Sequence, residues 1–317
     1  MNVKQLVRRL AKNVISTTFI YLAFSMCLST MTRAAVRTMN CACAVDADAE
    51  TADMESLGWH TNYAAAHANA KRERRMLLVN FVPEGGSAEQ RQFDGAIEKD
   101  RSLQLRLRSM VLVRLPRDYG SEAADYDGQL VNHSSFGHLI GGTGIAIVDL
   151  KNPGTPHYGK VVTALPFSRG KYYRWQMSHF TVALGLPPGT ITQRTMIWAV
   201  RIHPESPAST AGRGHRALEE AAKKHSEYQA RIQVQGHHRW ESRYQQVRSR
   251  ASADEASEVV AESWPNQNLI DSCIDCVASW RHSPGHWRAV RGRHRLFGYD
   301  IRRGRNGIWY GTGIFAN

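Results

Sequence analysis

Three short segments in the last third of the chain gather the side chains that could do chemistry. They read "GHHRW" at 236–240, "SEVVAESW" at 257–264 and "SWRHSPGHW" at 279–287. Glu258 stands on an apolar stretch, where an unpaired carboxylate is costly to bury, so we expect a cation or a histidine beside it. Adjacent side chains point in different directions, so at most one of His237 and His238 is expected to face a ligand.

Several neighbours of these residues are expected to be structural. His225, in "KKHSEY", is interpreted as a hydrogen-bonded histidine inside a helix, and His282 as a solvent-facing one. The tryptophans of this region are expected in the core, because burying each ring is worth roughly 2–3 kcal/mol. They are Trp240, Trp264 and Trp280. His286 is then the histidine whose role, in chemistry, ligand binding or packing, depends on the fold around it.

The residue pattern also predicts the elements that position these segments. A helix is expected over 192–203 and a stronger one over 217–236, closed by its glycine. A hairpin of two aromatic strands is expected over 297–316, around "GRNG". The predicted order is helix, histidine turn, glutamate strand or helix, helix, histidine turn and hairpin.

The first half of the chain alternates helices and strands. An alanine-rich helix after Trp59 leads into an apolar run at 76–82, and further apolar runs stand at 110–115 and 143–150. Strands that alternate with helices indicate an α/β layer structure. The glycines at 141–144 open onto a strand with no Lys-Ser or Lys-Thr after them, so they predict a turn and not a phosphate loop.

A first domain, expected over 56–185, resembles the thioredoxin-like fold. The order of its elements and the phrase "YAAAHANAKRERRMLLVNF" carry the resemblance, over about residues 57–165. That family has C-x-x-C after its first long strand, where this chain reads "PEGGSAEQ" at 83–90. The resemblance therefore implies a domain without redox cysteines that binds or scaffolds. The prolines of "LGLPPG" at 184–189 stop any helix and predict the boundary of this domain.

A second domain, expected over 186–317, resembles the CAP superfamily of SCP-like extracellular proteins. The residues that carry the resemblance are "AAKKHSEYQ", "GHHRW", "EVVA" and "WRHSPGH", of which the last is the most specific. This family implies an α-β-α sandwich. The fold class expected for the chain is thus α/β and α+β, with a thioredoxin-like domain followed by a CAP-like one.

The CAP resemblance also implies a cleft lined by His237, in preference to His238, together with Glu258 and His286. Two neutral imidazoles and a carboxylate can hold Zn²⁺ or another divalent cation, with a position left open for water. The same residues could bind a polar or anionic ligand without any metal.

Three functions stay open at this point. The family's second acidic cleft residue has no clear match, because Asp271 and Asp275 stand at an uncertain register, and "SEVVA" departs from the family's Gly-Glu-Asn-Ile-Ala segment. We therefore expect an exported binding protein. The alternatives are a metal-dependent hydrolase of peptide or cell-wall polymer with Glu258 as the catalytic base, and a structural envelope protein with a vestigial cleft.

Residues 1–35 have the features of a signal peptide. A basic start is followed by a mostly apolar stretch from Val14 to Leu28 and by small residues after "TRA". The stretch is short for a spanning helix, so a cleaved signal is expected and a signal-anchored membrane form is the alternative. Cleavage after Ala34 lowers the formal charge from +13 by five, to +8, and leaves 36–55 as a flexible lead-in. We expect a periplasmic or extracellular protein with no membrane span.

Four cysteines would remain after cleavage: Cys41, Cys43, Cys273 and Cys276. An even number in an oxidising compartment favours disulfides, and three connectivities are open. Spacing of i,i+3 in a helix puts Cys273 and Cys276 on one face, so a local disulfide is expected and a redox dithiol is the alternative. A site of four thiolates on zinc is disfavoured, because C-x-C is tight and the two pairs stand far apart in the chain.

The C-terminal region is strongly basic. Residues 281–305 hold eight arginines and one acid, Asp300. Such a cluster suits pairing with phosphate, sulfate or carboxylate, or it is a solvated basic face. For an exported protein we expect an acidic polysaccharide or a cell-wall polymer as the partner, and not nucleic acid.

Overall fold

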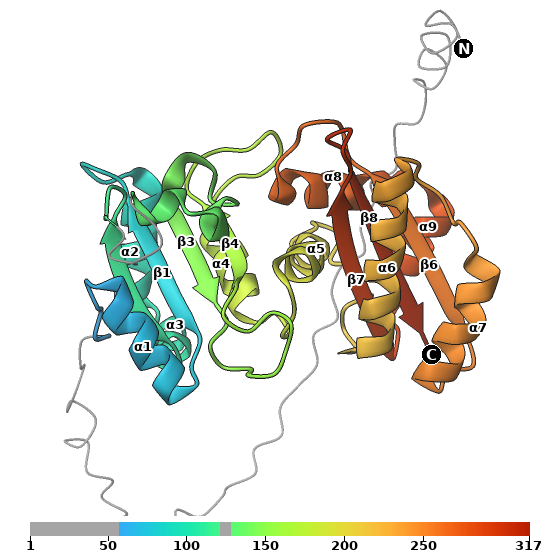
Figure 1. The fold of residues 1–317 in the computed structure, drawn as a ribbon, viewed down its shortest axis with the longest axis horizontal. Coiled ribbons are helices and arrows are strands. Elements are labelled where there is room, and N and C mark those ends of the chain that lie inside the picture. The colour runs from blue at the N-terminus through green and yellow to red at the C-terminus, as the bar shows by residue number, and fades with distance from the viewer. Residues whose placement is uncertain (1–56, 121–127) are drawn as a thin grey trace, which may run out of the picture. The chain divides into compact units, whose positions relative to one another are not determined.

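The computed structural model describes residues 57–120 and 128–317 and contains two mixed sheets, each covered by helices (Figure 1). The first sheet has the order β2-β1-β3-β4, with β1 parallel to β2 and the remaining pairs antiparallel. Its strands are β1 (Leu77–Val82), β2 (Val111–Pro116), β3 (Gly144–Val148) and β4 (Val161–Pro166). Its helices are α1 (Tyr63–Glu73), α2 (Ala88–Lys99), α3 (Arg101–Arg108) and α4 (Met177–Leu184).

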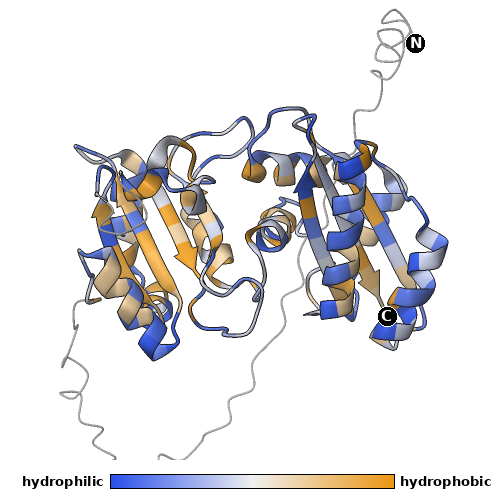
Figure 2. Ribbon diagram, in the orientation of Figure 1, coloured by the Kyte–Doolittle hydropathy of each residue, from blue (hydrophilic) through white to orange (hydrophobic). Residues whose placement is uncertain are grey.

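The strands of the first sheet are apolar on both faces because both faces are covered (Figure 2). Side chains alternate across a strand, and along β1 Leu78 joins one core cluster while Leu77 and Val79 join another. An uninterrupted apolar run, and not an alternating one, is what such a strand requires. The apolar runs at 76–82, 110–115 and 143–150 therefore predicted β1, β2 and β3 correctly, whereas β4 was not predicted.

The second sheet has the order β5-β7-β8-β6. Its strands are β5 (Arg213–Gly214), β6 (Ala256–Glu262), β7 (Leu296–Arg303) and β8 (Trp309–Ala316), so the predicted hairpin is confirmed. Helices α6 (Arg216–Ile232) and α7 (Trp240–Ala251) share a core cluster with one face. Helices α5 (Ile191–Arg201), α8 (Leu269–Arg281) and α9 (Pro284–Arg291) share the cluster of the other. Residues alternate along β7 accordingly, with Leu296 in the first cluster and Phe297 in the second.

Helix α6 lies very close to β7. A Cβ on Gly298 would overlap the backbone of Leu218 and Glu219, so only glycine fits at this point of the strand. This close approach fixes the distance between α6 and the sheet. Helix α6 carries His225 and Gln229, two of the residues that build the candidate site.

Helix α5 contacts both sheets and carries the buried guanidinium of Arg194. Arg194 donates to the carbonyls of Val162, Ala183, Leu186 and Pro187 and to the hydroxyl of Thr163. These bonds tie β4 and the α4–α5 link to α5, and one core cluster continues through both sheets. The division into two domains at 184–189 stays a prediction.

A second buried polar contact joins the two halves. The carboxylate of Asp271, on α8, accepts the backbone N–H groups of Lys171, Tyr172 and Tyr173 at 2.7–2.8 Å. Its exposed fraction is 1%, and the Asn268 side chain donates to it as well. Asp271 therefore holds the 171–173 loop and does not serve as a second acidic site residue.

Several sequence expectations differ from the structure. The helix expected over 217–236 ends at Ile232. The residue in the left-handed conformation that closes it is Gln233 and not Gly236. Residues 166–190, for which no element was predicted, contain α4. "SPGH" does not form a turn but starts α9, with Pro284 in the first turn, where its missing N–H costs nothing. Trp264 follows the end of β6 and is 63% exposed, whereas Trp280 is fully buried as expected.

Both described cysteines are free in the structure. Cys273 and Cys276 lie on the inner face of α8, as their spacing predicted, and are fully buried in the core. The local disulfide is therefore absent from the described residues, and burial raises the pKa of both thiols. Cys41, Cys43, the signal peptide and the lead-in lie outside the described residues, so any pairing with those cysteines stays a prediction. Within 57–120 and 128–317, no helix is long and apolar enough to cross a membrane.

Candidate functional site

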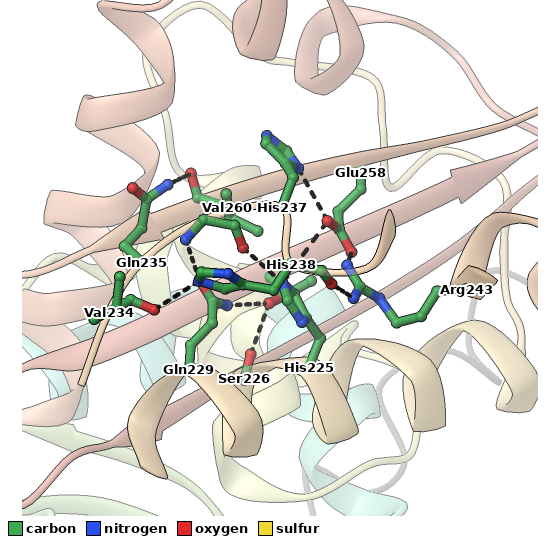
Figure 3. A network of polar contacts seen from close by, with 12 residues as sticks. His225, Ser226, Gln229, Val234, Gln235, His237, His238, Arg243, Glu258 and Val260 are labelled. Carbon is green, nitrogen blue, oxygen red and sulfur yellow. Dashed lines mark hydrogen bonds and ion pairs between the residues drawn. The ribbon is translucent and has the colours of Figure 1, made fainter. Parts of the chain in front are cut away.

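Glu258 is the centre of a polar cluster on the β6 side of the second sheet (Figure 3). Its side chain is completely buried. One carboxylate oxygen accepts from Nδ1 of His237 at 2.9 Å, and the other accepts from Nη2 of Arg243 at 2.5 Å. The expectation that a buried Glu258 needs a cation or a histidine partner agrees with this arrangement, in which it has both.

Two residues of α6 fix the loop that carries His237. The ring of His225 donates from Nε2 to the carbonyl of Gly236 at 2.9 Å, and the Gln229 side chain accepts the N–H of the same residue at 3.1 Å. Gln229 also donates to the buried hydroxyl of Thr312 on β8. Since both polar groups of the Gly236 backbone are held, the direction in which the next residue leaves the loop is determined.

His225 has the structural role that the sequence predicted. It is 2% exposed, and desolvation by burial lowers its pKa to about 4, although the nearby Glu258 carboxylate acts in the opposite direction. His225 is therefore neutral near pH 7 and acts as a fixed hydrogen-bond donor.

His237 and His286 face each other at the surface, and we call them the histidine pair. Their Nε2 atoms are 3.1 Å apart, and the His237 side chain is 43% exposed. His286 projects from α9. Burial and the neighbouring His237 lower the pKa of His286, with Glu258 acting in the opposite direction, so a neutral ring is favoured at pH 7. The structure thus brings together three of the residues implied by the CAP resemblance: His237, Glu258 and His286.

His238 points away from the histidine pair. Its Nε2 lies 3.3 Å from the Val234 carbonyl (Figure 3). Its ring also contacts Tyr228 and His225. The expectation that only one of the two adjacent histidines faces the site agrees with this geometry, and the one that faces it is His237.

Two facing imidazole nitrogens, with a carboxylate on the far nitrogen of one ring, are an arrangement that could hold a metal ion. Zn–N bonds of 2.0–2.1 Å at a tetrahedral angle place two nitrogens about 3.3 Å apart, close to the distance between these rings. Glu258 on the far nitrogen of His237 is the usual outer-shell partner of a metal-binding histidine. Among the residues that the structure describes, no group of three or more His, Cys, Asp or Glu side chains is arranged to hold a metal. Glu258 therefore stands behind His237 and not beside it.

Sequence reasoning missed Arg243 and Gln229. Arg243 comes from α7, donates to the His238 carbonyl as well as to Glu258, and places its guanidinium 5.6 Å from the Trp240 ring centre. The expectation that a buried Glu258 has a cation beside it was the one signal that could have led to Arg243. Gln229 gave no signal, because the sequence does not distinguish a buried glutamine of an amphipathic helix from a solvated one.

The comparisons with known proteins leave the family open. No family profile and no curated protein matches the chain. Among solved structures, an outer surface protein from Borrelia burgdorferi aligns with 16% identity and a TM-score of 0.28, over 33% of this chain and 77% of that one. A likeness of this size assigns neither fold family nor function.

Proposed function

We propose that the protein is an exported, CAP-like binding protein that holds an anionic ligand at the histidine pair with the help of a divalent cation such as Zn²⁺. The observation that carries this proposal is the facing of two Nε2 atoms at 3.1 Å, one of them on a ring whose Nδ1 donates to a buried glutamate. The first sheet would belong to a thioredoxin-like domain that has lost its redox cysteines and supports the binding domain.

The protonation states favour metal binding. The Nδ1 proton of His237 is fixed by Glu258, so in the neutral ring the lone pair lies on Nε2. The lowered pKa of His286 favours a neutral ring there too, and a proton on its Nδ1 leaves Nε2 free. Metal affinity should therefore fall as the pH drops and protons compete for these nitrogens.

An anionic ligand fits the remaining coordination. The chain supplies two nitrogens, so water and a ligand oxygen would complete a four-coordinate site. Arg243 already neutralises the charge of Glu258. The charge of a divalent cation bound at the histidine pair would therefore not be cancelled by Glu258 and would attract an anionic ligand. An acidic saccharide of the cell envelope, with ring carboxylates, is the ligand class that this charge suits.

The hydrolase alternative has less support. A catalytic base must reach the water that it deprotonates, but the Glu258 side chain is completely buried and both of its oxygens are engaged. The Glu258→Gln variant tests it directly, because the hydrolase would lose turnover while keeping its fold.

Calorimetry tests the proposal. Zn²⁺ would be titrated into the purified protein at pH 7.5, and trigalacturonate, an acidic oligosaccharide, into the metal-loaded and the metal-free forms. We expect His237→Ala and His286→Ala each to weaken Zn²⁺ binding more than about tenfold, since even outer-shell changes cost that much. His238→Ala is the matched control, because this ring points away, and it should change the affinity less than about twofold.

Trigalacturonate should bind the metal-loaded protein more tightly than the metal-free one. Equal Zn²⁺ affinity in all three histidine variants would refute the proposal. A trigalacturonate affinity that changes neither with metal nor with the variants would refute it as well. Either result would favour a structural envelope protein with a vestigial site.

A further inference from the structure

Helix α9 presents a second face that the histidine pair does not use. Pro284, Trp287, Arg288 and Arg291 recur at spacings of three and four, so they lie on one side of the helix. At about 100° per residue, His286 projects from roughly the opposite side. The face of Pro284, Trp287, Arg288 and Arg291 borders a hollow of about 740 Å³. Its lining residues are Arg281, His282, Pro284, Trp287, Arg288, Arg291 and Gly292.

One residue of this lining is a fixed indole. Trp287 is 6% exposed, and its Nε1 donates to a carboxylate oxygen of Glu205 at 3.1 Å. The ring of His203 lies 4.8 Å from the Trp287 ring, and the guanidinium of Arg281 lies 5.5 Å from its centre. Since Glu205 also pairs with Arg281, one carboxylate positions two of the lining side chains, Trp287 and Arg281.

The other two arginines of the lining have no partner in the part of the chain that the structure describes. Arg288 and Arg291 are exposed, and within the described residues no hydrogen bond or ion pair engages their side chains. They are three residues apart on α9, so both guanidinium groups can reach one bound group. Of the acidic side chains described, Glu205 contacts the lining residues Arg281 and Trp287, and it leaves Arg288 and Arg291 uncompensated.

We propose that this hollow, which we call the α9 anion pocket, binds a phosphate-bearing small molecule, such as a phosphorylated sugar or a diphosphate. A guanidinium donates in a planar fork to two oxygens, and two forks from neighbouring turns need three or four terminal oxygens. A phosphate group or a diphosphate offers them, whereas a single carboxylate satisfies one fork. The volume of about 740 Å³ lies within the range of small-molecule sites. The exposed edge of Trp287 supplies a small apolar contact for the rest of the molecule.

The α9 anion pocket is independent of the proposed metal site. It needs no cation, and its residues leave α9 on the other side from His286. A probe titrated in the presence of EDTA therefore reads binding that does not depend on the metal site.

Inorganic pyrophosphate, titrated calorimetrically into the full chain with EDTA present, is the test. We expect the double variant Arg288→Ala/Arg291→Ala to weaken binding by about tenfold or more. The matched control is Arg303→Ala/Arg305→Ala, which removes two exposed arginines of the β7–β8 hairpin and the same charge. It should change the affinity less than about twofold. His286→Ala should also leave it unchanged, whatever happens to Zn²⁺ binding.

A gain of binding gives a second readout that misfolding cannot imitate. Glu205→Gln removes the carboxylate that occupies Arg281 while an amide oxygen can still accept from Trp287. We expect this variant to bind pyrophosphate a few times more tightly, because a third guanidinium becomes available. The inference would be overturned by equal losses in the two arginine pairs, which would indicate a diffuse basic field. It would equally be overturned by a loss in His286→Ala, or by no binding to the native protein at millimolar pyrophosphate.

Discussion

Replacing Asp271 by asparagine should destabilise the protein far more than its small change in shape suggests. One oxygen of the Asp271 carboxylate accepts from the backbone N–H groups of Tyr172 and Tyr173, and the other from that of Lys171 and from Asn268. An asparagine keeps one oxygen. Whichever way its amide turns, at least one of these backbone N–H groups faces an NH₂ group, and the remaining bonds lose the help of the charge.

The magnitude follows from these contacts. A buried donor without an acceptor costs about 1–3 kcal/mol, and a bond to a charged acceptor exceeds one to a neutral acceptor by very roughly 1 kcal/mol. Asp271→Asn should therefore lower the free energy of unfolding by about 2–4 kcal/mol. Urea unfolding followed by tryptophan fluorescence measures this as a lower midpoint with an unchanged slope.

Asp275→Asn is the matched control. It changes the same group on the same helix, but Asp275 holds one backbone N–H, that of Trp264 at 3.2 Å. Burial already raises the pKa of Asp275, so loss of its charge should cost less than about 1 kcal/mol. If the two variants unfolded at the same urea concentration, the 171–173 loop would not depend on the Asp271 carboxylate and the reasoning would be refuted.

Two further predictions concern buried titratable groups. Between pH 6.5 and 4 the unfolded chain protonates the His225 ring but the folded one does not, so stability should decrease as the pH falls, by about 3 kcal/mol over that range. Urea midpoints at pH 7 and pH 4.5 should differ less in His225→Gln; an equal difference would contradict the role of this ring. Burial and raised pKa values should also keep Cys273 and Cys276 from reacting with Ellman's reagent until the protein unfolds, as peptide mapping can show. Rapid labelling of Cys273 or Cys276 in the native protein would contradict this prediction. If the same two cysteines stayed unreactive in the unfolded, unreduced protein, the expected disulfide would be reinstated.

The parts of the fold that could be predicted are those that a residue's own type determines. The apolar runs of β1, β2 and β3 are long because helices cover both faces of their sheet, and this leaves a local signal in the sequence. The face of α8 that carries Cys273 and Cys276 was equally local, since it follows from helical spacing.

What could not be predicted depends on partners that the fold brings from elsewhere. Arg243 and Gln229 become site residues only because α6 and α7 lie on the same face as Glu258, and no spacing in the sequence encodes that. Trp264 was expected in the core on the strength of its area alone. The strand that precedes it ends two residues earlier, at Glu262, so Trp264 lies outside the sheet and its ring is exposed.

The hold on Gly236 has a consequence for motion. A loop amide ordinarily exchanges its hydrogen with solvent quickly, but this one is bonded to a glutamine whose other end is bonded to Thr312 in the middle of the second sheet. Its exchange then requires the loop to break its bonds to both Gln229 and His225, so the Gly236 amide should exchange more slowly than those of its neighbours in the loop. A histidine carried by such a loop is already ordered before any ligand arrives, so binding there does not lose the entropy that a mobile loop would have to give up.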